Sequence, residues 1–86
     1  MDTELETRVQ INQKIWDNLV LIQDKVNLSD EQMADLLGSR LGDFRLFRAK
    51  KRAPPLLSLI RLSRRLNLEL SHIYFELPED INTLHH

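Results

Sequence analysis

The apolar residues of this chain recur at the spacing of an α-helix, and the pattern stops at a few defined points. From position 12 to 26 they return every three or four residues, as they do on one face of a helix. Ser29, Gly38 and the pair Pro54–Pro55 are residues typical of a helix start, a helix end and a helix break. No alternation of period two is long enough for a strand. The sequence therefore predicts an all-α protein built from short helices.

Five helices are expected between these breaks. The first covers 12–26, or begins at Thr3 if it runs unbroken, because Thr3 and Glu6 have the spacing of a capping box. The second begins after Ser29, whose hydroxyl and Gln32 also form a capping-box pattern, and ends at Gly38. The third follows at once, and the last two are expected over 55–66 and 69–76. The predicted core residues of the second, third and fifth helices are Met33, Leu36, Leu37, Leu41, Phe44, Phe47, Leu70, Ile73 and Tyr74.

Length and composition favour a single intracellular domain. A chain of 86 residues suits one compact domain with a modest core. It contains no cysteine, and no apolar run approaches the ~20 residues of a membrane span, so we expect a cytoplasmic protein with neither a disulfide nor a membrane segment. We expect residues 1–11 to extend the first helix, 12–76 to form the domain and 77–86 to be a flexible tail.

A second apolar stripe accompanies the first one if the first helix starts near Thr3. It consists of Leu5, Val9, Trp16 and Val20. Two stripes on one helix need two surfaces to cover them. The second stripe is therefore either a contact between two copies of the chain or a further part of the same core.

Charge is distributed very unevenly along the chain. Nine of the twelve basic residues lie between positions 40 and 65, where Asp43 is the only acid, so this window carries a net charge of +8. The rest of the chain carries −9. Such a separation indicates a polyanionic partner, and the plainer alternative is a solvated helix face.

The segment from Leu28 to Gly38, LSDEQMADLLG, resembles the second helix and turn of the lambda-repressor-like family, the Cro/repressor or xenobiotic response element type. Ala34 falls where that family keeps a small residue between two crossing helices. Met33, Leu37, Phe44 and Phe47 fall on its buried positions. The resemblance covers residues 12 to 76 and implies a compact five-helix domain with a helix-turn-helix.

The same resemblance implies a double-stranded DNA partner, with the third helix in the major groove. A homodimeric transcription regulator, most simply a repressor, is the function that follows. Arg40, Leu41, Gly42, Arg45 and Leu46 would then face the groove, with Ser39 and Arg48 beside them, while Lys50, Lys51 and Arg52 would meet the DNA backbone.

Four positions depart from the family pattern. Asp30 stands where the family commonly has a glutamine that contacts phosphate, and a carboxylate there is repelled by phosphate. Gly42 offers no side chain for reading bases, and Lys50 replaces a loop glycine. Arg48 replaces a glutamate, and its expected partners are Asp17, Asp24 or DNA.

Other functional classes have less support. Ser71 and His72 are adjacent in sequence rather than placed as nucleophile and base, so no catalytic residues are expected. The three histidines have no ligand spacing, and we expect no metal or cofactor. The main alternative is a protein-interaction module of the same fold: an antirepressor, an adaptor or the antitoxin of a toxin–antitoxin pair.

Overall fold

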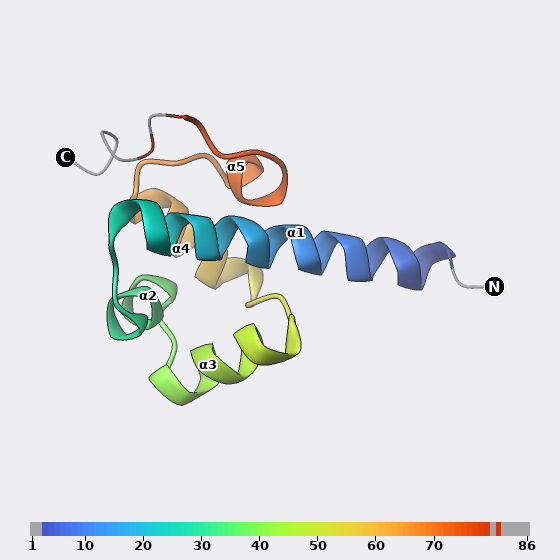
Figure 1. Ribbon diagram of the computed structural model, residues 1–86, viewed down its shortest axis with the longest axis horizontal. Coiled ribbons are helices and arrows are strands. Elements are labelled where there is room, and N and C mark those ends of the chain that lie inside the picture. The colour runs from blue at the N-terminus through green and yellow to red at the C-terminus, as the bar shows by residue number, and fades with distance from the viewer. Residues whose placement is uncertain (1–2, 80, 82–86) are drawn as a thin grey trace.

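One unbroken helix, α1 (Thr3–Val26), forms the long axis around which the other helices gather in this computed structural model (Figure 1). The structure describes residues 3–79 and 81. Four shorter helices follow α1 in this part of the chain, and the described residues contain no strand. They are α2 (Asp30–Leu37), α3 (Leu41–Lys50), α4 (Leu56–Arg65) and α5 (Leu70–Tyr74). The all-α prediction is confirmed, and so is the first helix that runs unbroken from Thr3. None of the described helices is long and apolar enough to cross a membrane.

The ends of α2 follow the local sequence signals. Ser29 Oγ accepts a hydrogen bond from the Gln32 amide at 3.1 Å, and Gln32 Oε1 accepts one from the Ser29 amide at 2.8 Å. Gly38 ends the helix with a φ of 69°, a left-handed conformation that costs glycine little. Its amide donates to the Asp35 carbonyl at 3.0 Å. The predicted capping box and glycine end of α2 are therefore confirmed.

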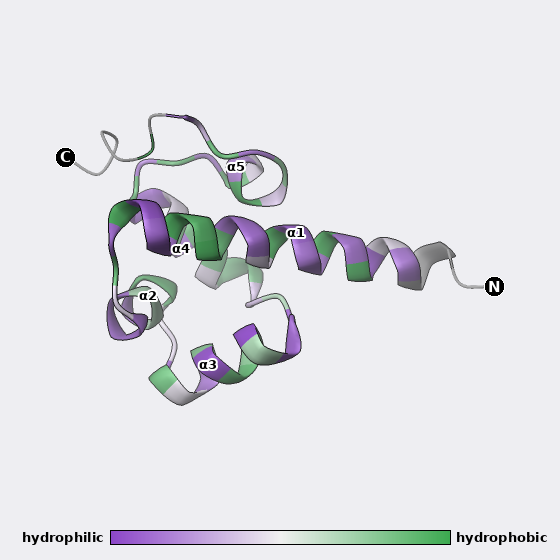
Figure 2. Cartoon of the chain, viewed as in Figure 1, coloured by the Kyte–Doolittle hydropathy of each residue, from purple (hydrophilic) through white to green (hydrophobic). Residues whose placement is uncertain are grey.

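The hydrophobic core lies where the C-terminal two thirds of α1 meet the other helices. α1 packs against α5, α2 packs against α3 and α4, and α4 packs against α5. Figure 2 shows hydrophobic and hydrophilic bands alternating along α1 and α3, as expected for helices with one buried face. The buried apolar residues are Ile15, Trp16, Leu19, Ile22, Met33, Ala34, Leu36, Leu37, Phe44, Leu59, Leu62, Leu66, Leu68, Ile73 and Ile81.

Trp16 belongs to this core and not to a surface stripe. Its side chain is 1% exposed, and its ring centroid lies 5.8 Å from that of Phe44. Val9 and Val20 remain exposed, and the side chain of Leu5 lies outside the described ones. Trp16 therefore follows the alternative of a further part of the core, whereas a contact between copies through the rest of the stripe stays a prediction.

The two phenylalanines of α3 do not contribute equally. Phe44 is 1% exposed and lies at the centre of the core, whereas Phe47 is only half-buried and packs against the core edge. Leu46 is exposed. The expectation that both phenylalanines are buried is therefore confirmed for Phe44 and corrected for Phe47.

Asn18 connects α1 to the end of α5. It is 4% exposed, and its Nδ2 donates to the Ile73 carbonyl at 2.7 Å and to the Phe75 carbonyl at 3.3 Å. Past α5, Leu77 packs against the core and Ile81 is 2% exposed. We expected a flexible tail over 77–86, but these two side chains take part in core packing. Residues 80 and 82–86 lie outside the described residues.

The unequal burial of the two phenylalanines leads to a stability prediction. Phe44→Ala should lower the free energy of unfolding by about 3 to 5 kcal/mol, because it empties a site with no water access. Phe47→Ala should cost clearly less, since water already reaches that ring. Urea unfolding followed by circular dichroism measures both. Equal losses for the two variants would contradict this assignment of the core.

Candidate nucleic-acid interface

Helix α3 lies at the outer edge of the molecule, on the far side of α1 from α5 (Figure 1). Most of the residues that the sequence assigned to a binding surface are exposed there. Arg40, Gly42, Arg45, Leu46, Lys50, Lys51 and Arg52 are exposed, and Ser39, Leu41 and Arg48 are half-buried. The fold thus brings these ten residues onto α3 and its two flanking turns.

The first turn of α3 is open to solvent. A methyl group added at Gly42 would meet no atom within 4 Å, so a partner can approach the backbone closely here. Arg40 is the N-cap residue and makes no side-chain capping bond. Ser39 Oγ is buried, and no hydrogen-bond partner is found for it among the described residues.

The basic loop of Lys50, Lys51 and Arg52 follows α3. Lys51 has a φ of 53°, so it is Lys51, and not Lys50, that takes the left-handed turn conformation. The Arg52 amide donates to the Phe47 carbonyl at 2.9 Å. The Arg52 carbonyl accepts a hydrogen bond of 2.8 Å from Trp16 Nε1. Buried Trp16 of α1 therefore fixes the backbone of the basic loop, while the side chains of the loop remain exposed.

Asp30, at the start of α2, accepts hydrogen bonds from three side chains. Arg48 contacts both carboxylate oxygens, with Nη1–Oδ1 at 2.8 Å and Nη2–Oδ2 at 3.0 Å. Arg45 Nε donates to Oδ2 at 3.1 Å, and Gln23 of α1 donates to Oδ1 at 2.7 Å. The network thus joins α1, α2 and α3, with Arg48 also lying 5.0 Å from the centroid of the Phe44 ring.

These contacts keep Asp30 ionised. The hydrogen bonds from Arg48, Gln23 and Arg45, in that order of importance, hold the pKa of the Asp30 carboxyl well below its usual range. The hydrogen bond to Asp30 in turn raises the pKa of Arg48. The carboxylate is therefore an acceptor at every pH near neutrality.

The network corrects the expected partner of Arg48. Arg48 pairs with Asp30 and not with Asp17 or Asp24, and only 33% of its side chain is exposed. Arg45 uses a single nitrogen and stays 56% exposed. No local sequence signal indicates this pairing, because Asp30 lies 15 and 18 residues away and meets the arginines only when α2 packs on α3.

Two arginines of α4 lie near residues of α2 other than Asp30. Arg61 Nε donates to the Asp35 carbonyl at 3.3 Å, beside Gly38 at the end of α2. Arg65 lines a surface concavity together with Glu31 and Asp35. The basic window of the sequence therefore divides between α3 and α4 in space, and at least these two α4 arginines lie near acidic or carbonyl groups of α2.

The described residues contain no cluster of three or more histidine or acidic side chains placed to hold a metal ion. His72 Nδ1 accepts a hydrogen bond from the Glu69 amide at 3.1 Å, which caps the start of α5. His85 and His86 lie outside the described residues. The chemistry of the α3 surface is that of guanidinium and ammonium groups, which bind anions and the acceptor edges of bases.

Asp30 leads to a prediction about acid stability. Its pKa is lower in the folded than in the unfolded chain, so its contribution is complete above the unfolded value of about 4 and is lost as the pH falls below that value. Asp30→Asn should cost about 1 kcal/mol at neutral pH, because water reaches both partners of the ion pair. The difference from wild type should shrink between pH 4 and pH 2 in chemical unfolding. Glu31→Gln is the control, and an equal pH dependence there would contradict the assignment.

The two glycines should respond oppositely to the same substitution. Gly42→Ala should stabilise the protein by about 0.5 to 1 kcal/mol, because alanine favours a helix and the added methyl has free space. Gly38→Ala should destabilise it, because φ is 69° and Arg61 Cδ would lie 3.1 Å from the new methyl. Thermal melts of both variants test this, and a stabilising Gly38→Ala would contradict the described turn.

Comparisons of the chain with protein-family models, with curated protein sequences and with solved structures found no match. The features of the chain that bear on its function are the exposed α3 surface, the basic loop behind it and the Asp30 network.

Proposed function

We propose that this chain is a sequence-specific, double-stranded DNA-binding regulator in which α2 and α3 act as a helix-turn-helix. The observation that supports this most is that α3 and its two flanking turns expose five cations on one edge of the molecule: Arg40, Arg45, Lys50, Lys51 and Arg52. α3 then lies in the major groove, with the loop cations on phosphates. The protein acts by occupying its site on DNA and not by chemistry, most simply as a repressor in the cytoplasm.

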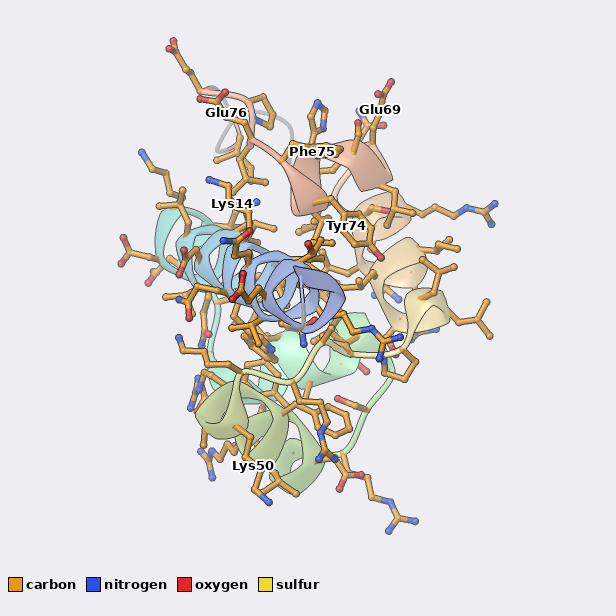
Figure 3. The ribbon with its side chains drawn as sticks, turned by 90° about the vertical axis from the view of Figure 1, so that its right-hand side faces the viewer. Lys14, Lys50, Glu69, Tyr74, Phe75 and Glu76 are labelled. Atoms are coloured by element: carbon orange, nitrogen blue, oxygen red, sulfur yellow. The ribbon has the colours of Figure 1, made fainter. Side chains whose placement is uncertain are left out.

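The charge distribution of the folded chain supports this proposal. Figure 3 shows Lys50 on the α3 side of the molecule and Glu69 and Glu76 on the opposite side, near α5. A duplex approaching α3 therefore meets cations first, while these two acidic side chains stay distant from the phosphates. This polarity is what a near-neutral chain needs in order to bind a polyanion.

The number of cations that remain available sets the expected salt dependence. Asp30 pairs with Arg48 and also holds Arg45, which leaves about four cations per subunit for phosphates: Arg40, Lys50, Lys51 and Arg52. In a dimer the logarithm of the association constant should then fall against the logarithm of salt concentration with a slope of about −7. That dependence is strong enough to account for tight binding at low salt.

A homodimer is part of the proposal, for a geometric reason. One short helix contacts only a few base pairs, and two-fold symmetry doubles the site with a spacing of about 34 Å. Because Trp16 is buried, the contact between copies cannot use the whole stripe expected from the sequence. Val9 and Val20 are the exposed apolar residues that remain of it among the described side chains.

A protein-interaction module is the second candidate, and two observations favour it. Asp30 offsets part of the charge of Arg45 and Arg48, and Leu56 and Leu57 at the start of α4 are exposed apolar residues. An antirepressor or adaptor would use such a surface for an acidic partner, and an antitoxin would bind both DNA and a toxin.

Selection of bound duplexes from a random DNA pool at physiological salt separates these candidates. The proposal expects a symmetric consensus with two half-sites one helical turn apart. Recovery of duplexes without a consensus would indicate a nonspecific binder. No recovery at all would favour the interaction module and contradict the proposed function.

Substitution of loop lysines gives a second test. Lys50→Ala should weaken binding to the consensus and to random duplexes alike and reduce the salt slope by about 1 for each subunit's contact. Lys14→Ala is the matched control, because Lys14 is an exposed lysine of α1 that Figure 3 shows well away from Lys50. Fluorescence anisotropy over a range of salt concentrations measures both. Equal effects of the two changes would argue against an interface at α3.

A further inference from the structure

The carboxylate of Asp30 contacts both arginines of α3, Arg45 and Arg48, but in different ways. Arg48 gives both of its terminal nitrogens to Asp30 and lies over Phe44, so it has no free fork with which to reach a ligand. Arg45 gives only Nε. Among the described residues no acceptor is found for Nη1 or Nη2 of Arg45, and 56% of its side chain is exposed.

We propose that Asp30 is a positioning residue that holds the Arg45 guanidinium so that its two terminal nitrogens read a guanine in the major groove. This inference rests on the proposed function. A guanidinium has five donors in a rigid fork, and its two Nη groups match O6 and N7 of guanine. Because Asp30 holds Nε of Arg45, the two Nη groups that fit guanine remain available.

Asp30 is itself held firmly enough to act as such a support. Arg48 and Gln23 donate to it at 2.7 to 3.0 Å, so both oxygens are engaged even without Arg45. Gln23 comes from α1 and Arg48 from α3, which anchors the carboxylate to two helices. A free arginine loses rotamer entropy when it is fixed, and an arginine already supported at Nε loses less of it on binding.

The presence of a carboxylate here also argues against a surface built for phosphate alone. For phosphate binding, Asp30 is unfavourable, because its charge offsets one of the cations that release counterions from DNA. For reading a base edge, the same charge is useful, because it fixes a direction for Arg45. Gly42, one turn before Arg45, leaves the space beside this side chain open for close approach of a base pair.

The test uses the full chain and two DNA probes: the duplex recovered by selection and a duplex of random sequence. Asp30→Asn should weaken binding to the selected duplex by about tenfold, within the range of one bidentate base contact. The same change should strengthen binding to the random duplex, because it removes a negative charge. Glu31→Gln removes the neighbouring exposed carboxylate of α2, so it should strengthen both equally and leave their ratio unchanged.

Three further measurements keep the test valid if Asp30→Asn loses stability. Arg45→Lys, at an exposed position, should lower the ratio as much as Asp30→Asn does, although it keeps the charge. Adding Asp30→Asn to Arg45→Lys should then lower the ratio no further, because both changes break one unit. Replacing the contacted guanine by 7-deazaguanine removes N7 alone and should weaken the wild type but not Arg45→Ala, which has no side-chain donor.

The outcomes separate this inference from the function on which it rests. A wild-type chain that prefers no duplex sequence overturns both. A wild-type preference that survives Asp30→Asn, or a gain in affinity for both probes alike, overturns only the role of Asp30. Such a gain would make Asp30 a simple charge offset on the α3 surface.

Discussion

The contact between Trp16 and Phe44 is the interaction on which the α3 surface depends. Trp16 donates to the Arg52 carbonyl and so fixes the basic loop, while the Phe44 ring supports the guanidinium of Arg48. Arg48 in turn pairs with Asp30 and joins α3 to α2. Because these contacts are continuous, the aromatic core and the charged surface are parts of one structure. A change in the orientation of the Phe44 ring would therefore disturb both the basic loop and the Arg48–Asp30 pair.

This arrangement explains how a nearly neutral chain presents a cationic edge. An acidic residue of α2 lies beside these cations, because Asp30 pairs with both terminal nitrogens of Arg48. What remains is a smaller set of cations, at the start of α3 and in the loop after it, with Arg45 between them. Such a surface attracts a polyanion less strongly than the basic window of the sequence suggests. It also gives Arg45, which Asp30 holds only through Nε, a better defined direction.

Local signals account for most of the secondary structure. The capping box at Ser29, the left-handed Gly38 and the proline pair before α4 each act within a few residues, so their effects are readable without the fold. The exposure of Arg40, Lys50 and Arg52 was also predictable, because charged side chains seldom leave water. The unequal burial of Phe44 and Phe47 was not, since both have the same spacing and differ only in what packs against them.

The sequence by itself determined an all-helical chain, the ends of α2, a leucine-rich core and a concentration of positive charge between positions 40 and 65. Only the tertiary structure decided that Trp16 is buried, that Arg48 pairs with Asp30, and that Arg61 of α4 contacts a different part of α2. The physical reason is separation along the chain. Helix propensity and capping act between near neighbours, whereas ion pairs and ring contacts join residues that meet only after the helices have packed.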